Sequence, residues 1–212
     1  MEQARVIAVS VGRARDAEWA GRMKRTAIDK RPVGDRVKVG ELGLIGDEQA
    51  DLVNHGGPEQ AVYVYAREDL DFWAAQIGRG LRDGAFGENL TTTGLDVTGA
   101  RIGERWRIGS VLGELTGPRI PCGVFRTWMN ERGWAKHFAA EARTGVYLRV
   151  LETGDVGAGD PVERVYRPDD APTVAESVRA YYGDTDQLRR ILAVPTHGPK
   201  WDRRAAGLLK DA

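Results

Sequence analysis

The chain contains one cysteine in 212 residues, Cys122, which excludes any disulfide within it and is typical of a reducing compartment. No apolar run approaches the ~20 residues of a membrane-spanning helix, and the N-terminus lacks the layout of a signal peptide. Basic and acidic residues both number 31, so the net charge of zero gives no reason to expect nucleic acid or an anionic membrane as partner. We therefore expect a cytoplasmic protein that binds neither nucleic acid nor a membrane.

Several common active-site motifs are also missing. The three histidines and one cysteine offer no pair at the spacing of zinc ligands. The glycine-rich loops of nucleotide-binding proteins and the Gly-x-Ser-x-Gly turn of many hydrolases are absent. The sequence therefore gives no support to a zinc enzyme, a nucleotide-binding protein or a serine hydrolase of that type.

Glycine is unevenly distributed along the chain. Of 27 glycines, 24 lie in the first 160 residues and only three follow. Glycine-rich sequence is typical of short strands joined by tight turns, and glycine-poor sequence favours helices. The proline- and aspartate-containing stretch 167–172 separates the two parts and has the composition of a linker. We therefore expect a β-domain over residues 1–167 and a small helical segment over residues 172–212.

Patterns of apolar residues predict short strands in the first part, and 67–76 and 124–129 have helical spacing. Many short strands with few intervening helices favour a closed β-barrel over a doubly wound sheet. The predicted fold class is mainly β with helices (α+β). The predicted strands are 5–11, 36–44, 61–65, a pair within 101–116 that turns at Gly109-Ser110, and 145–151.

The second part contains helix-start signals. Thr173 with Glu176 forms a capping box, Asp184 precedes a second helix, and a third covers 200–209. Helices this short bury little surface alone, so they should dock on the barrel or on a partner chain. A homodimer is therefore one possible arrangement.

Cys122 is the first candidate for chemistry. It lies in residues 118–123, PRIPCG, after a predicted strand and before a predicted helix. Prolines stiffen this turn, while the helix start and Arg119 would favour a thiolate over a thiol. A thiolate suits a soft metal or nucleophilic chemistry, and a buried apolar cysteine is the alternative.

Two further candidates lie earlier in the chain. His55 precedes Gly56-Gly57, where its ring either transfers protons in a pocket or bonds nearby carbonyls. The acidic residues at 47, 48 and 51 either hold a divalent ion or form a solvated loop, and the loop is favoured.

Polar groups that suit a ligand complete the set. Asn89, in the Gly-Asn-containing loop 86–90, offers a donor and an acceptor. Lys24, Thr26 and Lys30 would suit a phosphate, with ordinary surface as the alternative reading of each.

In order and approximate spacing, these motifs resemble MOSC domains, which include the C-terminal domain of molybdenum cofactor sulfurase. The similarity is greater to the stand-alone bacterial YiiM-like branch, in which three short helices follow the barrel. The matching stretches are 46–51, 55–57, 61–65, 87–90, 119–122 and the tail 173–209.

This resemblance implies a β-barrel that binds molybdenum cofactor in its molybdopterin form. Cys122 matches the cysteine thought to ligate molybdenum, and His55 and Arg119 match positions around the metal. Lys24, Thr26 and Lys30 would bind the cofactor phosphate, with Asn89 beside the bound group.

The resemblance also implies a function. Relatives reduce N-hydroxylated compounds such as amidoximes, hydroxylamines and N-hydroxylated bases. No flavin or haem motif is evident, so electrons should come from a separate reductase. Two alternatives stay open, a sulfur carrier with a persulfide on Cys122 and a protein that stores or delivers the cofactor.

Overall fold

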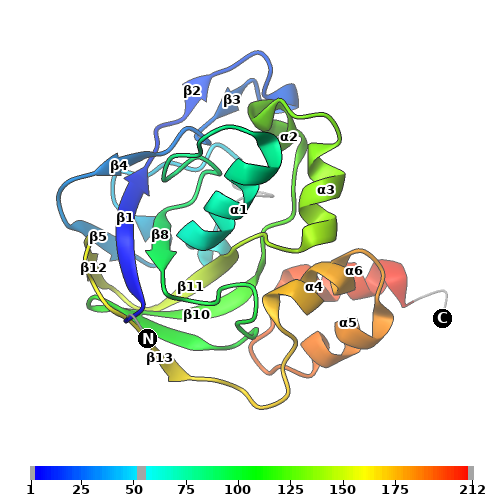
Figure 1. Ribbon diagram of the computed structural model, residues 1–212. Helices are drawn as coiled ribbons and strands as arrows, with labels where there is room; N and C mark the ends of the chain where they lie inside the picture. The colour runs from blue at the N-terminus through cyan, green and yellow to red at the C-terminus, as the bar shows by residue number, and fades with distance from the viewer. Residues whose placement is uncertain (1–2, 52–55, 210–212) are drawn as a thin grey trace.

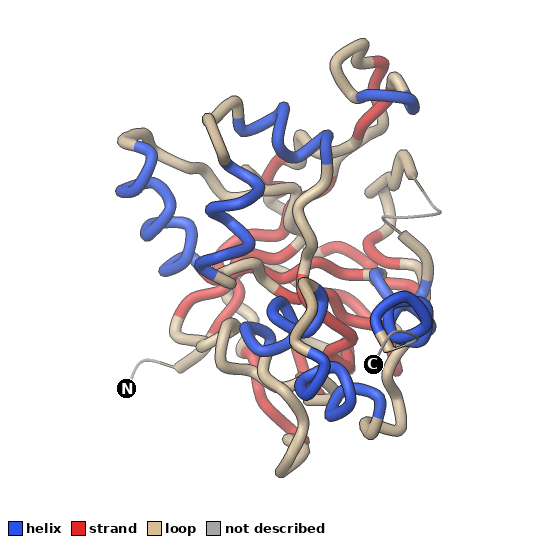
Figure 2. The backbone as a smooth tube through the Cα atoms, turned by 90° about the vertical axis from the view of Figure 1, so that its right-hand side faces the viewer, coloured by secondary structure: helices blue, strands red, loops and turns tan. Residues whose placement is uncertain are grey.

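The computed structural model describes residues 3–51 and 56–209 as a mixed α+β chain (Figure 1). A curved sheet forms the middle of the molecule, α1 to α3 cover one end, and α4 to α6 pack beside it. Figure 2 shows the strands gathered centrally, with the β2–β3 hairpin projecting beyond them. No helix within the described residues is long and apolar enough to span a membrane.

The strands are β1 (Arg5–Val11), β2 (Arg15–Asp16), β3 (Arg25–Thr26), β4 (Arg31–Val33), β5 (Val37–Gly40), β6 (Gly43–Leu44), β7 (Val62–Ala66), β8 (Leu90–Thr93), β9 (Arg105–Ile108), β10 (Val111–Pro118), β11 (Val146–Glu152), β12 (Gly154–Val156) and β13 (Val162–Tyr166). The helices are α1 (Arg67–Ile77), α2 (Gly123–Met129), α3 (Trp134–Glu141), α4 (Val174–Tyr181), α5 (Thr185–Leu192) and α6 (Pro199–Leu208), with the short 3-10 turns η1 (Gly21–Met23) and η2 (Pro58–Gln60).

The main sheet has eight strands in the order β13-β9-β10-β11-β7-β8-β1-β4. Its neighbours are antiparallel except for the parallel pair β7–β8. The start of β1 returns to the residues before β13 through a bridge between Arg5 and Pro161, and the Val6 amide donates to the Asp160 carbonyl at 2.9 Å. The prediction of a closed barrel is therefore corrected. The sheet is curved, and the start of β1 is joined to the residues before β13 by an isolated bridge and not by a continuous ladder of paired residues.

Two of three apolar cores pack against the main sheet, and the third lies among α4 to α6. The inner face of the sheet is filled by branched side chains around Trp106, so the interior is packed and not a pore. A second, aromatic core lies between the sheet and α1 to α3. Its largest members are Trp73, Phe86, Phe125, Trp134 and Phe138.

The three C-terminal helices dock on β10 through Trp201, which is fully buried. Its indole Nε1 donates to the Thr116 carbonyl at 3.0 Å, and its ring covers Gly117, where a Cβ would lie 3.3 Å from the ring. Thr173 and Glu176 form the predicted capping box, and Asp184 accepts from the Gln187 amide at the start of α5. The tail thus packs on the strand that leads to Cys122.

Strand β1 has the predicted bounds, and the other predicted strands and helices overlap observed elements, with one exception. The single strand predicted over 36–44 is instead two short strands, β5 and β6, that pair with each other across a turn. Two elements near the site were missed. Strand β8 reads LTTT, which lacks alternation because its first three residues are all buried. Helix α3 begins after Gly133 with a positive φ, without a side-chain cap. The division at residues 1–167 and 172–212 stays a prediction.

Replacing Trp201 tests the docking of the tail. We expect Trp201→Ala to lower the free energy of unfolding by about 3–5 kcal/mol, because a large buried ring is removed. Trp201→Phe should cost less, since it keeps most of the ring and loses the indole hydrogen bond. Urea titration followed by circular dichroism measures both. Tyr182→Ala, on a half-exposed ring, is the control and should change stability by no more than about 0.5 kcal/mol. Equal midpoints for all variants would contradict this docking.

Candidate functional site

Cys122 lies at the start of α2, where it is the N-cap residue. Its Sγ accepts a hydrogen bond from the Phe125 amide at 3.4 Å, and the side chain is partly exposed. Donation from an amide stabilises negative charge on sulfur. The sequence prediction of a thiol on a stiff turn before a helix is therefore confirmed in its geometry.

Arg119 is buried close to Cys122 in the chain. Its Nη1 donates to the Phe86 carbonyl at 3.0 Å, and its guanidinium lies 4.2 Å from the Phe125 ring centroid and 5.2 Å from that of Tyr63. Burial lowers the pKa of Arg119, but Tyr147, Tyr63 and Cys122 raise it, and the net shift is upward. The arginine thus remains a buried cation that interacts electrostatically with Cys122.

One polar atom of Arg119 lacks a protein partner. Among the described residues, nothing accepts a hydrogen bond from its buried Nε. An unsatisfied buried donor is costly, and a donor on a cation suits an anionic ligand. Arg119 is therefore the residue of this site best suited to bind negative charge.

Residues 84–89 form the loop that holds Arg119. The buried carboxylate of Glu88 accepts from the Gly84 amide at 2.6 Å, the Phe86 amide at 2.9 Å and the Thr91 hydroxyl at 3.2 Å. At Gly84 φ is +77°, and a Cβ there would lie 2.6 Å from a backbone oxygen of residue 30. Glu88 thus orders the loop whose Phe86 carbonyl receives the arginine. Burial raises the pKa of Glu88 to about 7.

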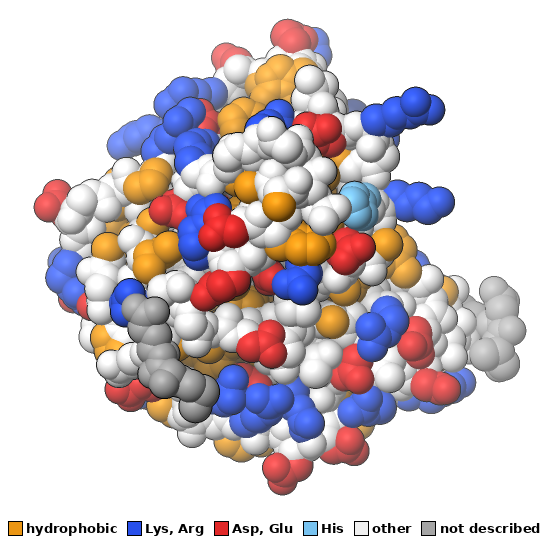
Figure 3. Space-filling view, viewed as in Figure 1, with side chains coloured by type: hydrophobic (Ala, Val, Ile, Leu, Met, Phe, Trp, Pro, Cys, Tyr) orange, Lys and Arg blue, Asp and Glu red, His pale blue; other side chains and the backbone are white. Residues whose placement is uncertain are grey.

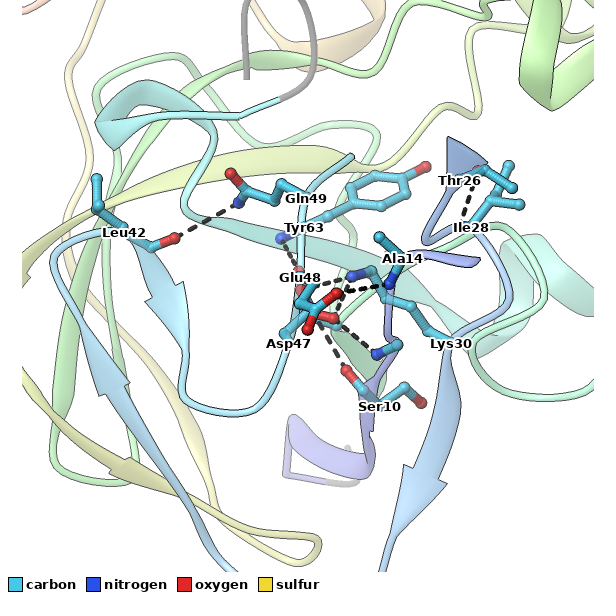
Figure 4. A network of polar contacts seen from close by, with 12 residues as sticks. Ser10, Ala14, Thr26, Ile28, Lys30, Leu42, Asp47, Glu48, Gln49 and Tyr63 are labelled. Atoms are coloured by element: carbon cyan, nitrogen blue, oxygen red, sulfur yellow. Dashed lines mark hydrogen bonds and ion pairs between the residues drawn. The ribbon is translucent and has the colours of Figure 1, made fainter. Parts of the chain in front are cut away.

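A second buried carboxylate, Asp47, lies beside this loop (Figure 4). It pairs with the buried Lys30, accepts from the Gly12 amide at 2.8 Å and accepts from Asn89 Nδ2 at 2.9 Å. Asn89 Oδ1 in turn accepts from the Tyr63 amide at 3.1 Å. Burial lowers the pKa of Lys30, while Asp47 raises it. The solvated loop expected at residue 47 is therefore wrong, because the Lys30 ammonium offsets the burial of its carboxylate.

His55 lies outside the described residues, and residues before and after it make hydrogen bonds. Gln49 Oε1 accepts from the Gly57 amide at 3.3 Å. The Thr116 hydroxyl donates to the Glu59 carbonyl at 2.6 Å. Thr116 belongs to β10, so the strand that leads to Cys122 also holds the segment after His55.

The structure brings some of the predicted site residues together and separates others. Cys122, Arg119, Lys30 and Asn89 belong to one connected region. Arg119 lies on the ring of Phe125, whose amide donates to Cys122, and it donates to the loop that contains Asn89. Asn89 donates to Asp47, which pairs with Lys30. Lys24 instead pairs with Glu18 at 3.0 Å on the exposed hairpin.

The remaining predicted residue, Thr26, accepts a hydrogen bond from the Ile28 amide at 3.2 Å. Glu88 and Tyr63 were not among the predicted site residues, although both lie in stretches that match the family, and Asp47 was considered only as part of an acidic cluster.

Metal binding by side chains alone has little support here. Among the described residues, no three His, Cys, Asp or Glu side chains are placed to hold an ion. A metal at Cys122 would therefore need donors from a cofactor in addition to the thiolate.

The Lys30–Asp47 pair makes a direct prediction. Asp47→Ala should lower the free energy of unfolding by about 3–5 kcal/mol, because it leaves a buried ammonium without its counter-ion. The double variant Lys30→Met with Asp47→Ala should be less destabilised than the sum of the single variants. Urea titrations of the four proteins give this coupling, and additive effects would contradict a buried ion pair.

Glu88 predicts a pH dependence of stability. Its folded pKa of about 7 exceeds the ordinary value of 4.5, so the folded state holds the proton more tightly. The stabilisation is complete below about pH 4.5, is lost as pH rises through about 7, and amounts to about 3 kcal/mol. Glu88→Gln should remove this slope in urea titrations between pH 4.5 and 8. An unchanged slope in the variant would contradict the assignment.

Basic and acidic side chains are both spread over the face of the molecule drawn in Figure 3.

Comparisons with known proteins place the chain in a family. The MOSC domain matches residues 51–163. YflK of Bacillus subtilis is 34% identical over 94% of this chain and 92% of its own, and YiiM of Escherichia coli is 32% identical over 89% and 88%. A protein of Gibberella moniliformis named "Reductase" is 32% identical, but the match covers 77% of this chain and only 29% of that protein.

Solved structures agree with the sequence relatives. The crystal structure of YiiM from Geobacillus stearothermophilus has a TM-score of 0.80 at 26% identity and covers 97% of this chain and 99% of its own. That of YiiM from Escherichia coli has a TM-score of 0.78 at 26% identity, with 100% and 95% covered. The chain therefore belongs to the MOSC domain family, in its YiiM-like branch.

Proposed function

We propose that this protein is a molybdenum-cofactor-dependent reductase of N-hydroxylated compounds. The observation that carries the proposal is the placement of a partly exposed thiol, Cys122, beside a buried arginine whose Nε has no partner among the described residues. Membership of the MOSC family and a relative named as a reductase support an oxidoreductase function.

The residues present fit the cofactor by their chemistry. A thiolate is a suitable ligand for a soft metal centre, and Cys122 is the only one the chain offers. The unpartnered Nε of Arg119 suits an anionic oxygen of a pterin phosphate or of a metal-bound group. Lys30 and Asn89 already bond to Asp47, so in this proposal they position the loops around the site. Lys24 and Thr26 lie on the hairpin and are not part of it.

Reduction of an N–OH group to N–H and water consumes two electrons and two protons. The cofactor, when bound, supplies the two-electron redox chemistry. Cys122 would hold it through sulfur, and Arg119 would stabilise negative charge at the reacting oxygen. His55 would deliver a proton to the leaving oxygen, since a histidine titrates near neutral pH. The electrons would come from a separate reductase.

The test is metal and pterin analysis on protein from a host that makes molybdenum cofactor. We expect about one molybdenum and one pterin per chain in the wild type, and loss of metal in Cys122→Ser. Reduction of benzamidoxime driven by dithionite-reduced viologen should fall by more than about 100-fold in that variant. Replacing a residue that only hydrogen-bonds to a metal ligand typically lowers metal affinity or activity by about 10–100-fold, and loss of the ligand itself should cost more.

Thr127→Val, on the exposed side of α2, is the matched control and should keep both metal and activity. Full activity in Cys122→Ser would reject the ligand role. A wild-type protein that is folded, lacks molybdenum and pterin, and carries one extra sulfur on Cys122 would instead establish a sulfur carrier. Tight cofactor binding without turnover of any N-hydroxylated substrate would indicate storage or delivery.

A further inference from the structure

The β2–β3 hairpin carries an excess of positive charge on a chain whose net charge is zero. Residues 13–25 contain five basic side chains and two acidic ones. Arg15 and Arg22 are exposed, and the acidic Asp16 and Glu18 pair with Arg25 and Lys24 of the same hairpin. Arg13 also lies 4.0 Å from the Glu48 carboxylate. Exposed pairs of this kind contribute little energy, and residues 13–25 by themselves have an excess of three positive charges. Figure 3 shows Lys and Arg side chains at this end of the molecule, beside acidic and hydrophobic ones.

The hairpin also contains an exposed tryptophan that contacts α2, the helix that begins at Cys122. Trp19 is 42% exposed and stacks on Trp128 of α2, with ring centroids 6.0 Å apart and an interplanar angle of 23°. Trp128 Nε1 donates to the Ala85 carbonyl at 2.8 Å, in the loop ordered by Glu88. Cys122 begins the same helix, six residues earlier, which is about 9 Å along a helix axis. The exposed stack is therefore connected by one short helix to the proposed metal ligand.

We propose that this surface, formed by Arg13, Arg15, Trp19, Arg22 and Arg25, docks a small acidic electron-transfer protein of the ferredoxin or flavodoxin type. The inference rests on the proposed function, because that reaction needs electrons from outside the chain. Two reduced ferredoxins, each giving one electron, and two protons would convert one N–OH group to N–H and water.

Charge complementarity favours an acidic partner at this patch, where residues 13–25 contain five basic side chains against two acidic ones. The rest of the chain carries the balancing negative charge, so an acidic partner would be attracted to this end and repelled elsewhere. An exposed tryptophan beside arginines is also the composition expected at the centre of a protein interface.

The test compares two electron sources in the cofactor-loaded protein. Arg15→Glu with Arg22→Glu should lower kcat/KM for reduced plant-type ferredoxin by about tenfold or more at low salt, because charge reversal weakens steering. The same double variant should keep the wild-type rate with reduced viologen, a small donor that needs no docking. The ferredoxin-driven rate of the wild type should fall with increasing salt, and that of the variant should not.

Two controls separate charge from folding. Arg15→Lys with Arg22→Lys keeps the charge and should behave as wild type. Arg189→Glu reverses an exposed charge on α5 and should have no effect on the ferredoxin-driven rate. Equal loss in all three variants, or an equal loss with viologen and ferredoxin in the glutamate variant, would overturn the proposal.

A binding measurement keeps this inference separate from the proposed function. If viologen-driven reduction is absent in the wild type, the proposed function fails, and docking is then judged by calorimetric titration of ferredoxin and flavodoxin into the same protein. Salt-dependent binding that the double charge reversal weakens at least tenfold supports the surface. Absence of binding to both carriers, or tighter binding of duplex DNA at the same salt, overturns it.

Discussion

The buried carboxylate of Asp47 and its partner Lys30 connect segments that lie far apart in the chain. Asp47 receives hydrogen bonds from Gly12 at the end of β1 and from Asn89 just before β8, and it begins the segment that leads to His55. Neither charge is stable alone in this interior, because burial without a counter-ion costs several kcal/mol. The pair therefore holds together the end of β1 and the segment just before β8.

A second set of contacts connects the site to the C-terminal helices through β10. Thr116 accepts from the Trp201 indole through its carbonyl and donates to the Glu59 carbonyl through its hydroxyl. Lys200 Nζ also donates to the Pro118 carbonyl at 3.3 Å, just before Arg119. One strand thus carries the contacts of the tail, the end of the histidine loop and the cysteine. The tail therefore packs against the strand that precedes Arg119 and Cys122.

Buried and exposed cations have different surroundings in this neutral chain. Inside, each cation near Cys122 has a protein partner for at least part of its hydrogen-bonding capacity, as Lys30 has Asp47 and Arg119 has the Phe86 carbonyl. On the surface, Lys24 and Arg25 of the hairpin pair with exposed carboxylates, and such exposed ion pairs are weak. Buried groups hold geometry because water does not compete for them, whereas exposed groups remain available to a partner.

Local sequence determined the elements whose signals are local. The alternation of β1, the capping box at Thr173 and the PRIPCG turn at Cys122 each act within a few residues, so periodicity and cap chemistry were enough to predict them. The ordered motifs also identified the family. Only the tertiary structure decided that Lys30 pairs with Asp47, that Glu88 is buried, and that β1 is joined to the residues before β13 by a bridge and not by a continuous ladder. These outcomes depend on burial and on contacts between distant segments, and no local pattern reports either quantity.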